Sequence, residues 1–356
     1  MPSTPSSARP DGARRARALG LGCGRLKPGA RNAITDVPGV QVGHCTIADG
    51  AVQTGVTAIV PHAGNLYRDK PVAAADVLNG FGKSVGLMQV DELGTLETPI
   101  LLTNTLSVGT CATALVRRAI GRNPDIGRTT ATVNPVVCEC NDGFLSDIQA
   151  LAVAEAHAWA ALDAAGTEAA VGAVGAGRGM SAFGFKGGIG TASRRLTLDG
   201  GGFHLGVLVL ANFGRAGDLR LPDGRRVAPP AGPAGGTEKG SVIVIAATDV
   251  PLDHRQLRRV ARRAGVGLAR VGSFWGNGSG DIALAFTTGN RVNHDEAADI
   301  VSFRVLNEGR IDRLFEAMAD ATQEAVLDAL VAAEPLTGRD GHHRPSLADL
   351  LMEGLA

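Results

Sequence analysis

The pair Gly240-Ser241 stands where a loose stretch rich in glycine and proline gives way to the apolar run Val242-Ile243-Val244-Ile245. A serine hydroxyl becomes a nucleophile when a neighbouring base accepts its proton. If the peptide bond before Ser241 is cut, the serine's own α-amine supplies that base, because the pKa of an α-amine is ordinarily about 7.7–8.0. Gly240 suits such a cut, since it adds no side chain to an acyl shift from nitrogen to oxygen. The same pair is also typical of an ordinary loop that ends at a strand.

A second hydroxyl and a carboxylate stand close together in the stretch Gly278-Ser279-Gly280-Asp281, directly before a predicted strand over 282–286. Residues two apart point to the same side of an extended backbone. Ser279 and Asp281 can therefore relay protons and orient an amine at Ser241. A tight turn is the simpler interpretation of Gly-Ser-Gly-Asp taken alone.

Three polar residues follow predicted strands and are candidates for contacts with a substrate. Asn212 comes after the predicted strand 203–210. Its amide can donate to an oxyanion, although an asparagine at a strand end is usually a turn former. Glu139 follows the predicted strand 133–138, where a carboxylate can anchor a cationic substrate group or simply carry a surface charge. Asn141 lies two residues further along the chain.

Several familiar catalytic and binding motifs are absent from the sequence. There is no HExxH metal motif. The stretch Gly80-Phe81-Gly82-Lys83-Ser84 fails as a phosphate loop, because Val77 occupies the position of the first glycine. A Ser-His-Asp triad stays open, since its members need not be close in sequence. None of the eight histidines has a suggestive context, however, and His44 is interpreted as structural.

Composition narrows the class of protein. The 35 basic and 35 acidic residues give a formal net charge of zero, so nothing electrostatic favours nucleic acid or an anionic membrane surface. No apolar run is long enough to span a membrane, and the basic N-terminus lacks the apolar segment of a secretory signal. We therefore expect free thiols, a cytoplasmic location, no metal and no organic cofactor. The cysteines, whose irregular spacing completes no zinc site, are Cys23, Cys45, Cys111, Cys138 and Cys140.

The chain of 356 residues can form one large domain or two. Residues 1–20 are predicted to be a mobile tail, and residues 215–240 a linker. The polar turn 103–109 is first interpreted as a helix cap, although its hydroxyl groups also suit a substrate pocket. Asp253 and Gln256 predict the cap of another helix. The remaining pattern predicts strands over 56–60, 85–90, 99–102, 133–138, 203–210, 242–245 and 282–286, and helices over 111–120, 145–165 and 311–333.

The order and spacing of these segments resemble the aminopeptidases of the DmpA/BapA type. This family comprises the L-aminopeptidase/D-esterase-amidases and the β-peptidyl aminopeptidases. The resemblance covers nearly the whole chain, from about residue 25 to the C-terminal helix. It is carried by the stretches 32–44, 102–109, 212–214, 240–250 and 278–281.

The resemblance implies a precursor that cuts itself before Ser241 into an α chain (1–240) and a β chain (241–356). It implies that residues 21–356 form a single α/β domain, a four-layer α-β-β-α sandwich. This fold resembles that of N-terminal nucleophile hydrolases but differs in strand connectivity. A homo-oligomer, a tetramer by the same resemblance, is expected, with small peptides or amides as substrates.

The resemblance also implies roles for individual residues. Ser241 is the nucleophile, and Asn212 donates its side-chain amide to the oxyanion. Ser279 and Asp281 assist the proton transfers, with an acidic residue expected at position 281. Glu139 matches the carboxylate that holds the free amine of the substrate. Asn141 occupies a position that is aromatic in some members, which bears on side-chain specificity.

The expected activity is removal of an N-terminal residue from short peptides, amides or esters through an acyl-enzyme. Two alternatives remain. An acyltransferase of the ornithine acetyltransferase type also cleaves itself, but it uses threonine where this chain has Ser241. A non-catalytic, uncleaved binding protein on the same scaffold is the second alternative, and the presence of Asn212, Ser279 and Asp281 argues against it.

Overall fold

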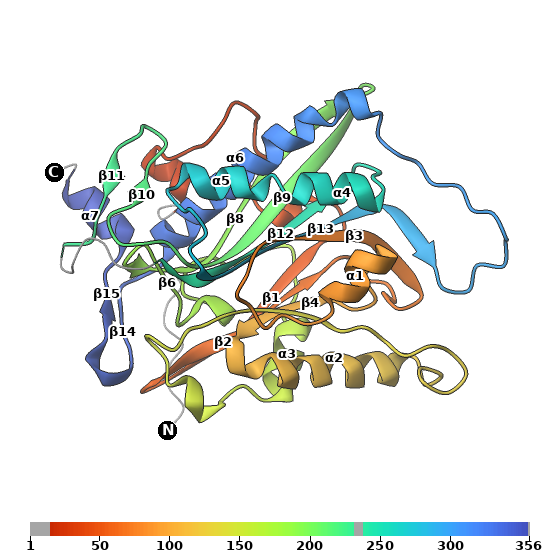
Figure 1. Cartoon of the computed structure of the whole chain (residues 1–356), viewed down its shortest axis with the longest axis horizontal. Coiled ribbons are helices and arrows are strands. Elements are labelled where there is room, and N and C mark those ends of the chain that lie inside the picture. The colour runs from red at the N-terminus through yellow and green to blue at the C-terminus, as the bar shows by residue number, and fades with distance from the viewer. Residues whose placement is uncertain (1–14, 231–237, 355–356) are drawn as a thin grey trace.

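Two β-sheets lie face to face between two layers of helices in the computed structural model, which describes residues 15–230 and 238–354 (Figure 1). The strand order is β1-β2-β4-β5 in the first sheet and β3-β13-β12-β9-β8 in the second. This is the four-layer α/β sandwich expected from the sequence. The strands are β1 (Gln41–Asp49), β2 (Val52–Val60), β3 (Asp69–Gly80), β4 (Ile100–Asn104), β5 (Val136–Cys140), β8 (Gly188–Leu198), β9 (Gly201–Asn212), β12 (Lys239–Thr248) and β13 (Gly278–Asn293).

The central strand β12 shows why the layers form. Its side chains alternate, so that Val242 and Val244 join the core under the helices, whereas Ile243 and Ile245 join the core between the sheets. All four side chains are buried, and burying each such side chain is worth about 1.5–3 kcal/mol. A strand that is apolar on both faces is stable only when both faces are covered.

Helices cover the outer face of each sheet (Figure 1). The helix α2 (Val108–Arg122) and the helix α3 (Glu155–Asp163) pack on the first sheet. The second sheet carries α4 (His254–Ala261), α5 (Ala264–Arg270) and α6 (Asp312–Ala332). Among the helices of the described ranges, none is both long and apolar enough to cross a membrane. Two short helices, α1 (Leu87–Leu93) and α7 (Leu347–Glu353), complete the helical part.

Close approach of α6 to the sheet depends on a glycine. A Cβ atom at Gly190 in β8 would lie 1.9 Å from the carbonyl oxygen of Ala325 in α6. Backbone atoms on both sides leave no room to relieve that contact. Small residues therefore set the distance between sheet and helix in this layer, as the high glycine and alanine content of the chain indicates.

The N-terminal segment is more ordered than predicted. Residues Ala16–Leu19 form a 3-10 helix that packs against α6. Arg15 pairs with Asp328 at 2.8 Å, and Arg17 pairs with Glu324 at 2.7 Å. The prediction of a mobile tail is therefore wrong for residues 15–20, because ion pairs to buried carboxylates hold them. Residues 1–14 lie outside the described part of the chain.

Two predicted elements are wrong in type or length. The segment 85–90 is not a strand, because Gly86 adopts a positive φ of +85° and starts helix α1. The helix predicted over 145–165 is limited to α3, and Leu151 interrupts the preceding segment with a φ of +48°. Short apolar or alanine-rich runs do not by themselves distinguish these conformations.

Other predicted elements are confirmed within a few residues. The strand 242–245 lies in β12, and the helix 311–333 corresponds to α6. Asp253 and Gln256 form a capping box at the start of α4. Part of the predicted linker packs as a small hairpin of β10 (Leu219–Arg220) and β11 (Arg226–Val227). Residues 231–237 of that linker lie outside the described ranges.

Candidate active site

Ser241 lies near the start of β12, between two neighbouring strands. In the pairing register it stands opposite Asn212 of β9 and Gly280 of β13. It is only 5% exposed. Its Oγ donates to the carbonyl oxygen of Gly240 at 2.7 Å and accepts from the backbone N–H of Gly280 at 3.3 Å. The hydroxyl is thus held beside the carbonyl group of the bond that self-cleavage would break.

The backbone at Gly240 is one that only glycine adopts easily. Its φ is +131°, and a Cβ atom there would lie 2.1 Å from the carbonyl oxygen of Asn212. Side chains are disfavoured in this conformation, and a backbone oxygen cannot move away as a flexible side chain would. The backbone around the bond before Ser241, near the start of the buried strand, is therefore tightly constrained.

Ser279 and Asp281 lie directly beside this bond. Ser279 stands opposite Gly240 in the parallel pair of β12 and β13, and its Oγ donates to Oδ1 of Asp281 at 2.7 Å. Both residues are completely buried. Burial raises the pKa of Asp281 to about 6, with a further increase from the charge of Glu238, while the hydrogen bond from Ser279 acts in the opposite direction. A carboxyl group of this kind can accept and release a proton near neutral pH.

Asn212 is the last residue of β9, and both the oxygen and the nitrogen of its side-chain amide form hydrogen bonds. Its Oδ1 accepts from the backbone N–H of Ser181 at 2.9 Å, and its Nδ2 donates to the carbonyl oxygen of Asn141 at 2.9 Å. These two bonds fix which end of the amide is the donor. The second hydrogen on Nδ2 has no partner among the described residues and can donate to a developing oxyanion.

Glu139 lies near the end of β5 and is almost completely buried. Its Oε1 accepts from the backbone N–H of Lys83 at 2.8 Å, and its Oε2 accepts from the hydroxyl of Thr105. Within the described residues no arginine, lysine or histidine forms an ion pair with it. A positioned carboxylate without a countercharge suits a substrate ammonium group.

A cavity of about 800 Å³ joins these groups. Five of the predicted site residues line it. Ser279 and Asp281 lie on β13, the strand that pairs with β12 beside Ser241. No histidine is among the lining residues, so the structure offers no partner for a Ser-His-Asp triad at this cavity. The lining residues are Phe81, Lys83, Thr105, Glu139, Asn141, Phe144, Ser181, Phe183, Gly184, Asn212, Gly214, Gly240, Ser241, Asn277, Gly278 and Arg344.

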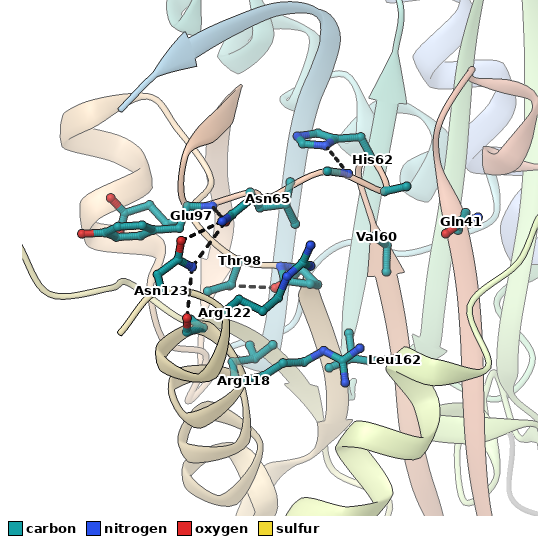
Figure 2. Close-up of a pocket in the computed structure, with 17 residues that line it drawn as sticks. Gln41, Val60, His62, Asn65, Glu97, Thr98, Arg118, Arg122, Asn123 and Leu162 are labelled. Atoms are coloured by element: carbon teal, nitrogen blue, oxygen red, sulfur yellow. Dashed lines mark hydrogen bonds between the residues drawn. The ribbon is translucent and has the colours of Figure 1, made fainter. Parts of the chain in front are cut away.

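A second, smaller cavity of about 200 Å³ lies between α2 and the loop after β2 (Figure 2). Its polar groups largely satisfy one another. His62 accepts from the N–H of Gly64 at 3.0 Å, and the Nδ2 of Asn65 donates to Asn123 at 2.6 Å. None of the predicted site residues lines it. The larger cavity is therefore the candidate active site.

Several residues around the site were not recognised from the sequence. Lys83 and Thr105 hold Glu139. The segment of Lys83 was interpreted only as a failed phosphate loop, and that of Thr105 as a helix cap whose hydroxyl groups also suit a substrate pocket. Ser181 positions Asn212. Glu238 is buried and accepts from the hydroxyl of Ser273 at 2.7 Å. Only Thr105 had a sequence signal, because it belongs to a cluster of hydroxyl residues.

His44 is structural, as interpreted from the sequence. Its Nδ1 lies 2.9 Å from the hydroxyl of Thr57, and burial lowers its pKa to about 4. The cysteines are free, which agrees with the predicted thiols. Over residues 15–230 and 238–354, no group of three or more His, Cys, Asp or Glu side chains is placed to hold a metal ion.

The fold and the site define a class of enzyme, the serine hydrolases with an N-terminal nucleophile. Comparison with known proteins identifies the family. Residues 32–344 match the family model described as "Peptidase family S58". The chain therefore belongs to this family. It is a serine aminopeptidase of the N-terminal nucleophile type.

Individual relatives agree with this assignment over almost their whole length. The β-peptidyl aminopeptidase BapA of Sphingosinicella microcystinivorans is 39% identical over 354 residues, which are 92% of this chain and 88% of that protein. A Burkholderia sp. β-aminopeptidase structure has a TM-score of 0.87 and 43% identity, covering 96% of this chain and 98% of that one. The L-aminopeptidase D-Ala-esterase/amidase of Ochrobactrum anthropi, a prototype serine aminopeptidase with a variant Ntn hydrolase fold, has a TM-score of 0.87 and 35% identity, with coverage of 96% and 98%.

Proposed function

We propose that the chain processes itself at the Gly240–Ser241 bond. The hydroxyl of Ser241 attacks the carbonyl carbon of Gly240, and its proton passes to the departing backbone nitrogen. The resulting ester is hydrolysed by water, which leaves a carboxylate on Gly240 and a free amine on Ser241. The observation that carries this proposal is the Ser241 hydroxyl held 2.7 Å from the Gly240 carbonyl oxygen. Ser279 and Asp281 supply the proton relay.

The processed enzyme then uses the new amine as its base. The amine accepts the proton of the Ser241 hydroxyl, and Oγ attacks the carbonyl carbon of the substrate. Asn212 donates to the oxyanion of the tetrahedral intermediate. The leaving amine or alcohol takes up the proton, and water releases the acyl group from Ser241 in a second step. Asp281 and Ser279 hold and relay protons between these steps.

Glu139 explains why a free N-terminus is required. Its carboxylate is buried and fixed by Lys83 and Thr105, so it binds an ammonium group at one position in the cavity. Substrates are short peptides, amides and esters with a free amine near the scissile carbonyl. Because similar proteins are named β-peptidyl aminopeptidases, substrates with an N-terminal β-residue belong in the same assay as their α-residue counterparts.

Intact mass and denaturing electrophoresis test self-processing. The purified wild-type protein should show two fragments, the smaller one comprising residues 241–356 and beginning Ser-Val-Ile-Val. Ser241→Ala should remain a single chain. An active wild-type preparation that contains only the full-length chain would rule out the mechanism, and a full-length, inactive preparation would favour a binding protein.

Acyl transfer is the second candidate reaction, because an amine can attack an acyl-enzyme in place of water. Release of alanine from alanine amide, measured with and without an added amine acceptor, separates the two. Hydrolysis predicts free alanine in both cases, whereas a transferase depends on the acceptor.

We further propose that the enzyme works in the cytoplasm and as a homo-oligomer of processed α and β chains. Five cysteines without a disulfide support a reducing compartment. Analytical ultracentrifugation of the processed protein would establish the number of subunits.

A further inference from the structure

Arg344 places a guanidinium group on the wall of the cavity that contains Ser241 and Glu139. It comes from β15 (His343–Arg344), far from the catalytic strands in sequence. Its Cζ lies 3.7 Å from the centre of the Phe144 ring. When a guanidinium stacks on an aromatic face, its N–H groups lie in its own plane, parallel to the ring. They stay available to a planar acceptor.

Contacts of two neighbouring residues, His342 and Arg339, fix the hairpin that carries this arginine. The ring of His342 stacks on Phe144 at 4.5 Å, and its Nδ1 lies 2.7 Å from the Phe144 carbonyl oxygen. Arg339 donates through Nε to the carbonyl oxygen of Gly143 at 2.7 Å. The hairpin of β14 (Leu336–Thr337) and β15 is thus attached to the segment that directly follows Glu139 and Asn141. Arg344 is therefore held on the wall of the cavity that Glu139 also lines.

Within the described residues, Arg344 has no countercharge. Its Nη1 donates to the carbonyl oxygen of His343 at 3.3 Å, and its enclosed Nε has no partner among the described residues. No Asp or Glu side chain of these residues lies within ion-pair distance of it. Burial alone lowers its pKa, without any contribution from a neighbouring acid. Most of the five N–H donors of this side chain are consequently unused.

Among the described residues, Glu139 as an anion and Arg344 as a cation face one cavity without forming an ion pair. The third charged residue on its wall, Lys83, has its Nζ 4.1 Å from the centre of the Phe81 ring. A dipeptide carries the complementary pair, an ammonium group at one end and a carboxylate at the other. Two extended residues span at most about 7 Å, so a dipeptide bound through its amine keeps its carboxylate within a cavity of about 800 Å³. A longer peptide carries that carboxylate further away.

We propose that Arg344 binds the C-terminal carboxylate of the leaving residue and makes free dipeptides the preferred substrate class. This inference rests on the aminopeptidase activity and on Glu139 as the amine site. Arg344 is thus a specificity-determining residue, with no part in the bond-breaking steps.

The test compares three substrates on the processed enzyme. Alanyl-alanine has the carboxylate, alanyl-alanine amide has the same shape without the charge, and alanine p-nitroanilide has neither. We expect kcat/KM of the wild type to be about 10- to 100-fold higher for alanyl-alanine than for its amide, the range for one hydrogen bond to a charged group. Arg344→Met should reduce this ratio to about 1, mainly by raising KM for alanyl-alanine, and Arg344→Lys should restore part of it.

A matched variant separates loss of charge from loosening of the hairpin. Arg339→Met removes the other arginine that attaches the hairpin, and it should keep the wild-type ratio because Arg339 does not line the cavity. If Arg344→Met does not fold, the wild-type ratio and Arg344→Lys still decide the question.

The outcomes are distinct. Equal kcat/KM of the wild type for alanyl-alanine and its amide would overturn the inference, while hydrolysis of alanine p-nitroanilide would leave the proposed activity standing. Failure to hydrolyse all three substrates would instead overturn the proposed activity. Aspartyl and asparaginyl p-nitroanilide form a further arm. If Arg344→Met changes discrimination only between these two, the carboxylate belongs to the acyl side, and the assignment to the leaving residue is wrong.

Discussion

Replacement of Gly240 by alanine should hinder both folding and self-processing. The added methyl group would lie 2.1 Å from the carbonyl oxygen of Asn212, in a backbone with a φ of +131°. A disfavoured backbone conformation costs about 1–3 kcal/mol, and forced overpacking costs about 1–3 kcal/mol more. The total is about 2–6 kcal/mol. Because Asn212 opposes Ser241 in the sheet, relief of the clash also displaces the hydroxyl from the bond to be cut.

This free energy corresponds to a measurable shift in unfolding temperature. An unfolding entropy of about 2.1 cal/mol/K per residue gives roughly 0.75 kcal/mol/K for a chain of this length, so the expected decrease is about 3–8 °C. Thermal unfolding should be measured on Ser241→Ala proteins with and without Gly240→Ala, so that processing does not contribute. In the Ser241 background, electrophoresis over time should show slowed appearance of the fragment 241–356.

Gly202→Ala is the matched control for this substitution. Gly202 lies in β9, the partner strand of β12, but a Cβ atom there has nothing within 4 Å. We expect this variant to unfold and process as the wild type does. If Gly240→Ala matched Gly202→Ala in both unfolding temperature and processing rate, the argument that a constrained backbone holds the scissile bond would be refuted.

Three further substitutions test the roles proposed for individual side chains. Asn212→Ala should lower kcat by about 10²–10³ with little change in KM, measured on the processed fraction; an unchanged kcat would assign the oxyanion to another donor. Glu139→Gln keeps one oxygen that accepts from the N–H of Lys83, and its NH2 group can donate to the hydroxyl of Thr105. Because the charge is lost, KM for alanine amide should rise about tenfold or more, whereas a substrate without an amine should be unaffected. Burial raises the pKa of Asp281 to about 6, above an ordinary value of about 3.9, so this group destabilises the fold as pH rises from about 4 to 6. Asp281→Asn should therefore gain unfolding temperature relative to wild type over that range. We also expect kcat of the wild type to rise with pH near 6 and kcat of Asp281→Asn to lack this rise; parallel profiles would contradict the assignment.

Much of the fold was predictable because apolar patterns are local. The alternating or continuous apolar runs in β9, β12 and β13 appear directly in the sequence, and so does the capping box at Asp253. The errors fall where local pattern is ambiguous. Gly86 and Leu151 change the backbone direction through positive φ values, which apolar periodicity does not reveal.

The candidate site was predictable in its residue types but not in its contacts. Ser241, Asn212 and Glu139 each follow from their places at strand ends, and the structure brings them to one cavity. The contacts that hold Glu139 come from the backbone of Lys83 and the hydroxyl of Thr105, on segments distant in sequence. Nothing in the local sequence pairs such segments.

The sequence by itself determined that a glycine precedes a serine at the start of a buried strand, and which residues carry a proton, an amide or a charge. The tertiary structure alone decided their neighbours. Sheet pairing places Ser241 between Asn212 and Gly280, and Ser279 opposite Gly240. It also decided that a C-terminal arginine, Arg344, faces the same cavity as Glu139. The physical reason is that residue chemistry is local, whereas pairing between distant strands and hairpins depends on the packing of the whole chain.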